Sequence, residues 1–129
     1  MEDDLGPGRF LLLLAAAHLA GSIAHGAFDP RSAMPCVGAS AGISGVLAYY
    51  ALAFPHARIG LLFWFLWRWL RLGAIWMLLL YALLQLLGAW RQVAGASHVS
   101  YLAHLGGMGV GALAALALRT KSSPAERRW

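Results

Sequence analysis

The sequence predicts an all-α polytopic membrane protein, a bundle of about four transmembrane helices with a short interfacial segment. Of the 129 residues, 60% are hydrophobic and only 12% are charged, whereas a soluble domain carries about 25% charged residues. The mean hydropathy is correspondingly high, at +0.66. This small number of charged side chains cannot cover a water-soluble surface. We therefore expect one compact domain that is surrounded by a lipid bilayer.

Four apolar segments have about the length of ~20 residues that a helix needs to cross a bilayer. We expect the transmembrane helices over residues 10–28, 36–54, 73–90 and 99–118. The first segment resembles a signal-peptide core, but the residues before it are acidic where a signal peptide is basic, so we expect a retained span. Residues 61–67 are apolar but too short to cross. Their tryptophans and the arginines that follow them predict an interfacial segment.

The basic residues predict the orientation. They lie between the apolar segments and form no patch, which argues against nucleic acid as a partner. If both termini are cytoplasmic, the inner side holds Arg9, Arg58, Arg68, Arg71, Arg119, Lys121, Arg127 and Arg128. The outer side then holds only Arg31 and Arg91. This bias predicts a multi-pass integral membrane protein with a membrane domain at 1–118 and a polar cytoplasmic tail at 119–129. The brevity and the Ala/Leu/Arg-rich composition suggest a bacterial inner membrane.

Ser40 and His104 are polar residues inside predicted spans. Such groups are costly in hydrocarbon and are therefore functional candidates. Serine and histidine together are also the minimum set for nucleophilic attack on a carbonyl. In the predicted topology both spans enter from the outer face. Each residue then lies about four to five positions below the start of its helix, roughly 6–8 Å deep on the same side.

Glycines accompany both candidates. Gly38 and Gly42 flank Ser40, while Gly107 and Gly111 follow His104. Small residues at this spacing let membrane helices pack backbone to backbone, which a Ser–His hydrogen bond would require. Glycines that serve packing alone are the alternative interpretation.

Two motifs carry a family resemblance. GASAGISGVL at 38–47 and AHLGG at 103–107 resemble the nucleophile and general-base motifs of the rhomboid family of intramembrane serine proteases. The similarity extends over residues 6–118. The resemblance implies a Ser40–His104 dyad without a third carboxylate, an oxyanion bound by backbone amides near Ala39 and Ser40, no cofactor and no metal. It also implies membrane-anchored proteins as substrates, cleaved near helix-destabilising residues.

The acidic residues agree with a dyad. They are Glu2, Asp3, Asp4, Asp29 and Glu126, and none lies deep in a predicted span. We therefore expect packing, and no acid, to orient His104. The same count excludes an aspartyl intramembrane protease and argues against a proton-coupled transporter. The absence of His-Glu-x-x-His argues against a site-2-type metalloprotease.

The chain departs from the family in four respects. It matches the third to sixth of six core helices, so we expect a catalytic fragment of low activity. The family's second helix carries a His-x-x-x-Asn motif that helps to bind the oxyanion, and this chain contains no asparagine. Ala41 stands where the family has glycine, and Ser44 stands where some relatives place an aromatic ring against the histidine. The alternatives are a non-proteolytic binder of client transmembrane helices and a structural four-helix subunit.

Other polar residues compete for a role. Ser44, one turn below Ser40, is the rival nucleophile, and Cys36 is a second rival that lacks a cationic neighbour to activate it. His18 and His25 share a helix face, but no acidic or cysteine partner accompanies them, so we expect no metal. We expect His25 to be hydrogen-bonded or to line a cavity near the outer end of its helix. The oligomeric state stays open.

Overall fold

The computed structural model describes residues 5–28, 39–63, 68–95 and 99–119. In these residues the chain forms helices α2 (Pro7–Phe28), α3 (Ser40–Ala53), α4 (Ala74–Val93) and α5 (Tyr101–Arg119), and strands β1 (Arg58–Phe63) and β2 (Arg68–Gly73). The predicted class, an all-α membrane bundle, is confirmed. The helices α2 and α4 and the segment Tyr101–Leu118 of α5 are long and apolar enough to cross a membrane.

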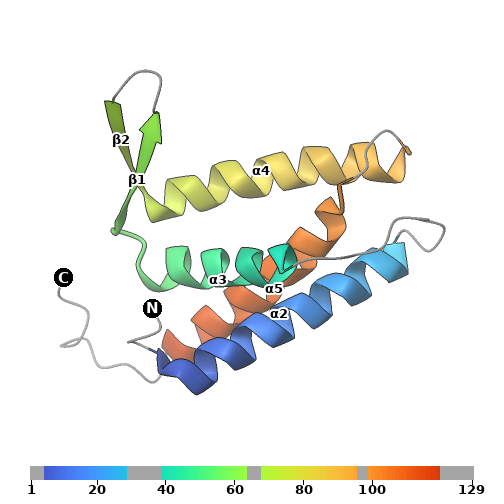
Figure 1. The fold of residues 1–129 in the computed structure, drawn as a ribbon, viewed down its shortest axis with the longest axis horizontal. Coiled ribbons are helices and arrows are strands. Elements are labelled where there is room, and N and C mark those ends of the chain that lie inside the picture. The colour runs from blue at the N-terminus through green and yellow to red at the C-terminus, as the bar shows by residue number, and fades with distance from the viewer. Residues whose placement is uncertain (1–4, 29–38, 64–67, 96–98, 120–129) are drawn as a thin grey trace.

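The helices alternate in direction, as a chain that crosses a bilayer repeatedly must do. The start of α2, the end of α3, the hairpin and the end of α5 lie at one end of the bundle, on the left in Figure 1. The end of α2, the start of α3, the end of α4 and the start of α5 lie at the other end. We call this second end the Ser40 end, because α3 begins there at Ser40.

The predicted start of the second span is wrong in the described part of the chain. Ala39 is the N-cap of α3, with φ −74° and ψ 1°, so Ser40 is the first helical residue and does not lie four residues inside a helix. Residues 29–38, which include Cys36 and Gly38, lie outside the described residues. The helix has 14 residues, a length of about 21 Å. The sequence does not show where this helix begins, because glycine and serine occur both at helix starts and on small-residue helix faces.

Residues 61–63 of the predicted interfacial segment belong to a strand of a β-hairpin, and residues 64–67 lie outside the described residues. Strand β1 pairs antiparallel with β2, with Arg58 opposite Gly73 and Phe63 opposite Arg68, and the hairpin projects from the bundle beside the start of α4 (Figure 1). In a hairpin each strand satisfies the backbone hydrogen bonds of the other, so a short segment needs no helix. A short apolar run does not reveal its secondary structure through periodicity, and for this reason the sequence did not predict the strands.

Helices α2, α3 and α5 pack through their backbones. A Cβ atom on Gly107 would collide with the carbonyl oxygen of Ala41, and one on Gly111 would collide with that of Gly45. A Cβ on Gly42 would lie 2.8 Å from the carbonyl oxygen of Leu14. Only glycine fits these crossings, as small-residue packing of membrane helices requires.

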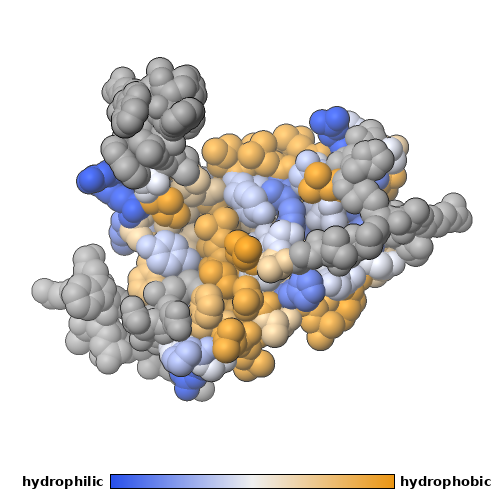
Figure 2. All heavy atoms as spheres, viewed as in Figure 1, coloured by the Kyte–Doolittle hydropathy of each residue, from blue (hydrophilic) through white to orange (hydrophobic). Residues whose placement is uncertain are grey.

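The outward faces of the helices are apolar, as Figure 2 shows for one side of the molecule. On α4 the exposed large side chains are Trp76, Leu79, Leu80, Leu83, Leu84, Leu86, Leu87 and Trp90. On α2 they are Leu11, Leu12, Leu19, Ile23 and Phe28. Water would disfavour such a surface, whereas lipid tails solvate it without cost.

Candidate active site

Ser40 lies at the exposed N-terminus of α3. No side chain among the described residues caps this terminus, so the first-turn N–H groups have no partner within the helix. Unpaired amides at a helix N-terminus favour negative charge. A nucleophile at this position therefore has potential oxyanion donors in its own backbone and in that of Ala39, the N-cap residue.

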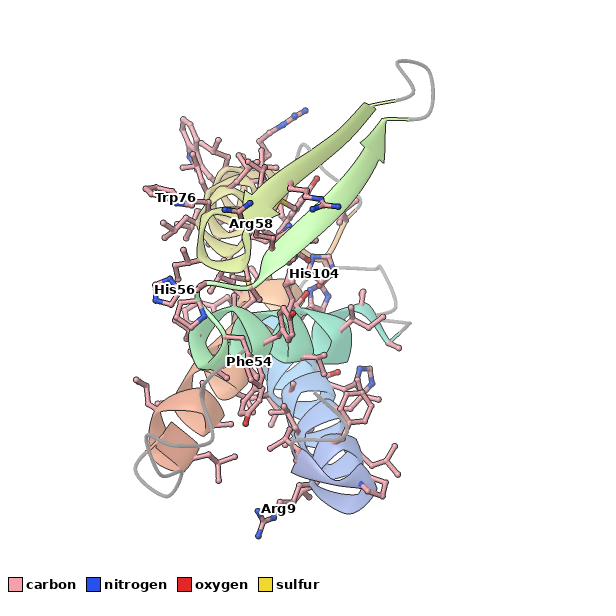
Figure 3. The ribbon with its side chains drawn as sticks, turned by 90° about the vertical axis from the view of Figure 1, so that its left-hand side faces the viewer. Arg9, Phe54, His56, Arg58, Trp76 and His104 are labelled. Atoms are coloured by element: carbon pink, nitrogen blue, oxygen red, sulfur yellow. The ribbon has the colours of Figure 1, made fainter. Side chains whose placement is uncertain are left out.

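His104 lies on the first turn of α5, half-buried between α4 and α3 (Figure 3). Its Nδ1 atom is 2.8 Å from Oε1 of Gln85 on α4. An amide oxygen therefore holds the ring in addition to the packing that the sequence led us to expect. Gln85 is not among the candidates expected from the sequence, although an amide among leucines in a membrane span is itself a signal of function.

Two tyrosine rings flank His104. The Tyr81 ring lies 6.5 Å from it at an interplanar angle of 31°, and the Tyr101 ring lies 6.4 Å away, edge-on at 81°. Some relatives place an aromatic ring against the histidine from the position of Ser44, and here Tyr81 supplies a ring from α4. The Tyr101 ring packs where Gly88 of α4 has no side chain.

Ser44, the rival nucleophile, is almost completely buried, with 1% of its surface exposed. Its Oγ lies 2.8 Å from the carbonyl oxygen of Ser40 and 2.9 Å from the Tyr81 hydroxyl. Because a carbonyl can only accept, the Ser44 hydroxyl donates to Ser40 and accepts from Tyr81. These bonds join α3 to α4 and leave Ser44 without access to water, which favours Ser40 as the nucleophile.

The crossing of α3 and α5 brings Ser40 and His104 to the same end of the bundle. Gly107, three residues after His104, contacts the backbone of Ala41, which follows Ser40. Each candidate residue thus lies within about one helical turn, 5.4 Å, of the same contact. Among the described residues no hydrogen bond joins the Ser40 hydroxyl to His104.

His25 forms a polar network at the same end. Its Nδ1 atom is 3.1 Å from Nε2 of Gln92 and 2.8 Å from Oγ of Ser100. Since Gln92 Oε1 accepts from the backbone N–H of Leu102, its amide nitrogen faces His25, and Nδ1 must be an acceptor. His25 is thus buried and hydrogen-bonded, one of the two roles expected for it, and it ties α2 to α4 and to Ser100, the residue before α5.

His18 does not join this network. Its Nδ1 atom is buried without a hydrogen-bond partner, and the side chain lines a cavity of about 530 Å³ with Ala39 and Gly42. In the described part of the chain no three histidine, cysteine, aspartate or glutamate side chains are grouped as a metal site requires. A second cavity of about 640 Å³ lies beside Tyr81, Gln85 and Tyr101.

Comparison with known families gives one match. The family model for the rhomboid domain matches residues 1–121, nearly the whole chain. The chain belongs to the rhomboid family. No curated protein and no solved structure matches it.

Membership of the rhomboid family agrees with the apolar helices, and the protein is therefore an integral membrane protein. Rhomboid proteins are typically intramembrane serine proteases that act on membrane protein substrates within the bilayer. The N-terminal end of α3 holds Ala39, Ser40 and Gly42. Helix α5 holds His104, Gly107 and Gly111. Gly38 lies outside the described residues.

Proposed function

We propose that this rhomboid protein is an intramembrane serine endopeptidase, with Ser40 as nucleophile and His104 as general base. The observation that carries the proposal is the backbone contact between Gly107 and Ala41, since it holds both candidates within a helical turn of one point. His104 is an ionisable residue in the apolar helix α5, which supports its assignment.

The proposed reaction follows from the atoms available. His104 takes the hydroxyl proton at Nε2 while Ser40 Oγ attacks the substrate carbonyl carbon. Backbone N–H groups of Ala39 and Ser40 bind the resulting oxyanion. Collapse breaks the peptide C–N bond, and His104 delivers its proton to the leaving amine. Water then attacks the acyl ester while His104 accepts its proton. The ester bond to Ser40 Oγ breaks, the carboxyl product leaves, and His104 returns the proton to Oγ.

We also infer the orientation from the charge bias. Arg9, Arg58 and Arg71 lie on α2 and the hairpin strands at the end opposite Ser40, so the positive-inside rule places Ser40 at the outer face. Both termini are then cytoplasmic. The substrate would be a membrane-anchored protein whose helix unwinds near that face and exposes a carbonyl to Ser40.

Fluorophosphonate labelling of the full chain in membranes tests the proposal. We expect the wild type to be labelled, and Ser40→Ala and His104→Ala to lose the label. Ser44→Ala removes the hydroxyl of the rival nucleophile and should retain the label, at a lower level to the extent that its bonds to Ser40 and Tyr81 position the site. A label that survives Ser40→Ala would overturn the assignment of the nucleophile.

A non-proteolytic binder of client helices is the second candidate function. It is favoured by the absence of asparagine from the chain and by the lack of a Ser40–His104 hydrogen bond in the described residues. A correctly inserted wild-type protein that takes no label supports this alternative over the protease. Cross-linking a transmembrane peptide to the Ser40 end then distinguishes a binder from a structural subunit.

A further inference from the structure

Gln85 is a buried amide in the middle of an apolar membrane helix. Only 6% of its surface is exposed, whereas Leu84, Leu86 and Leu87 around it are more than half exposed. An amide in such surroundings is unfavourable unless it is hydrogen-bonded. The rotation of α4 therefore directs Gln85 into the bundle for a specific partner.

That partner is the histidine assigned as general base. Gln85 Oε1 lies 2.8 Å from His104 Nδ1, and an amide oxygen can only accept a hydrogen bond. The imidazole must then carry its proton on Nδ1. Its lone pair lies on Nε2, the nitrogen on the other side of the ring.

No carboxylate can accept the hydrogen bond from His104 Nδ1 in the described part of the chain, which contains no aspartate or glutamate. In soluble Ser-His-Asp enzymes the acid holds the imidazole in this tautomer, and an amide that favours the wrong tautomer costs about 10⁴ in kcat. Gln85 presents its oxygen to the ring, so it is compatible with the productive tautomer without a buried charge.

A second contact ties the same face of α4 to the nucleophile helix. Tyr81 and Gln85 are four residues apart and lie on one helix face. Tyr81 flanks His104 and hydrogen-bonds Ser44, which in turn donates to the carbonyl oxygen of Ser40. Through these bonds α4 fixes the ring of His104 relative to the first turn of α3.

We propose that Gln85 is a positioning residue that holds His104 in the Nδ1-protonated tautomer and so makes Nε2 the base. The catalytic consequence rests on the proposed protease function, while the tautomer itself does not. Gln85 replaces the acid of a triad by a neutral acceptor, which suits a site that lies within a membrane span.

The tautomer can be measured directly by ¹⁵N NMR of full-length protein labelled at histidine, in bicelles. His104→Ala identifies the signals of His104. We expect one signal typical of a protonated Nδ1 and one of an unprotonated Nε2 in the wild type, and a mixture of tautomers in Gln85→Leu. Gln92→Leu is the matched control, because it removes an equally buried glutamine of α4 that contacts His25. It should leave the His104 signals unchanged. An Nε2-protonated wild type, or a Gln85→Leu spectrum identical to the wild type, would overturn the proposal.

Activity gives the second measurement. With a transmembrane substrate we expect Gln85→Leu to lower kcat by about 10- to 100-fold, as for other partners that orient a functional histidine, with KM changed by less than about threefold. Gln85→Glu keeps an oxygen acceptor. Its fold-loss in kcat should therefore be no larger than about the square root of the fold-loss in Gln85→Leu. Equal losses in both variants would contradict a positioning role and indicate a packing role.

The two proposals can fail separately. A wild type without label or cleavage contradicts the protease function, but the NMR signals still decide the tautomer. An active wild type whose activity and tautomer do not respond to Gln85→Leu contradicts the role of Gln85 alone.

Discussion

The hydroxyls of Ser44 and Tyr81 lie 2.9 Å apart, and this bond connects the helix that bears Ser40 to the helix that bears Gln85. Ser44 also donates to the carbonyl of Ser40. The outward leucines of α4 are about half exposed, so polar contacts on its inner face help to specify one position of this helix. In hydrocarbon such bonds have no competition from water, although their measured strength is modest, about 0.6 kcal/mol on average.

A double-mutant cycle on this pair should reveal the coupling. Ser44→Ala and Tyr81→Phe each remove one hydroxyl, and we expect each to lower the free energy of unfolding by about 1–2 kcal/mol. The double variant should lose less than the sum, with a coupling of about 0.5–1.5 kcal/mol. Unfolding in mixed micelles provides the free energies. Strict additivity would show that the bond contributes nothing to stability.

The crossing of α3 and α5 should not tolerate a side chain at Gly107. We expect Gly107→Ala to destabilise the protein by about 1–3 kcal/mol, because the new Cβ would meet the backbone of Ala41 and force the helices apart. Labelling of Ser40 should fall with it. Gly109→Ala is the control on the same helix, since a Cβ there meets nothing within 4 Å. It should be neutral or stabilising by up to about 1 kcal/mol. Equal stability of the two variants would contradict the close crossing.

Gln92 should contribute to the stability of the Ser40 end. Gln92→Leu removes the acceptor of the Leu102 N–H and a donor to His25. The Leu102 N–H then loses this acceptor and His25 Nδ1 keeps only its bond to Ser100, which should cost about 1–3 kcal/mol. Val93→Ala, at an exposed neighbouring position, is the control and should change the free energy of unfolding by less than about 0.5 kcal/mol. A Gln92→Leu protein as stable as the control would show that water replaces the network.

Reporter fusions check the orientation. Alkaline phosphatase is active only outside the cytoplasm, so a fusion after Gly95 should be active and a fusion after Trp129 inactive, because the positive-inside rule keeps the Arg-rich side inside. A fluorescent protein that folds only in the cytoplasm should show the reverse pattern. The opposite result at both sites would invert the proposed topology and place Ser40 at the inner face.

Much of the fold could be predicted because a bilayer restricts a chain strongly. Runs of about 20 apolar residues predicted four helices, and glycine spacing predicted which helices approach closely. The strands at Arg58–Phe63 and Arg68–Gly73 could not be predicted, since a short apolar run is compatible with several structures. The start of α3 at Ser40 could not be predicted either, because small residues are compatible with both a cap and a helix interior.

For the candidate site, the sequence by itself determined the two candidates for nucleophile and general base. Ser40 and His104 stand out because hydrocarbon penalises polar groups. Only the tertiary structure decided that Gln85 orients His104, that Tyr81 flanks it, and that Ser44 is committed to other bonds. These contacts depend on how α4 is rotated about its axis. A membrane helix that is apolar on nearly every side carries little sequence signal for that rotation, and only packing against α3 and α5 sets it.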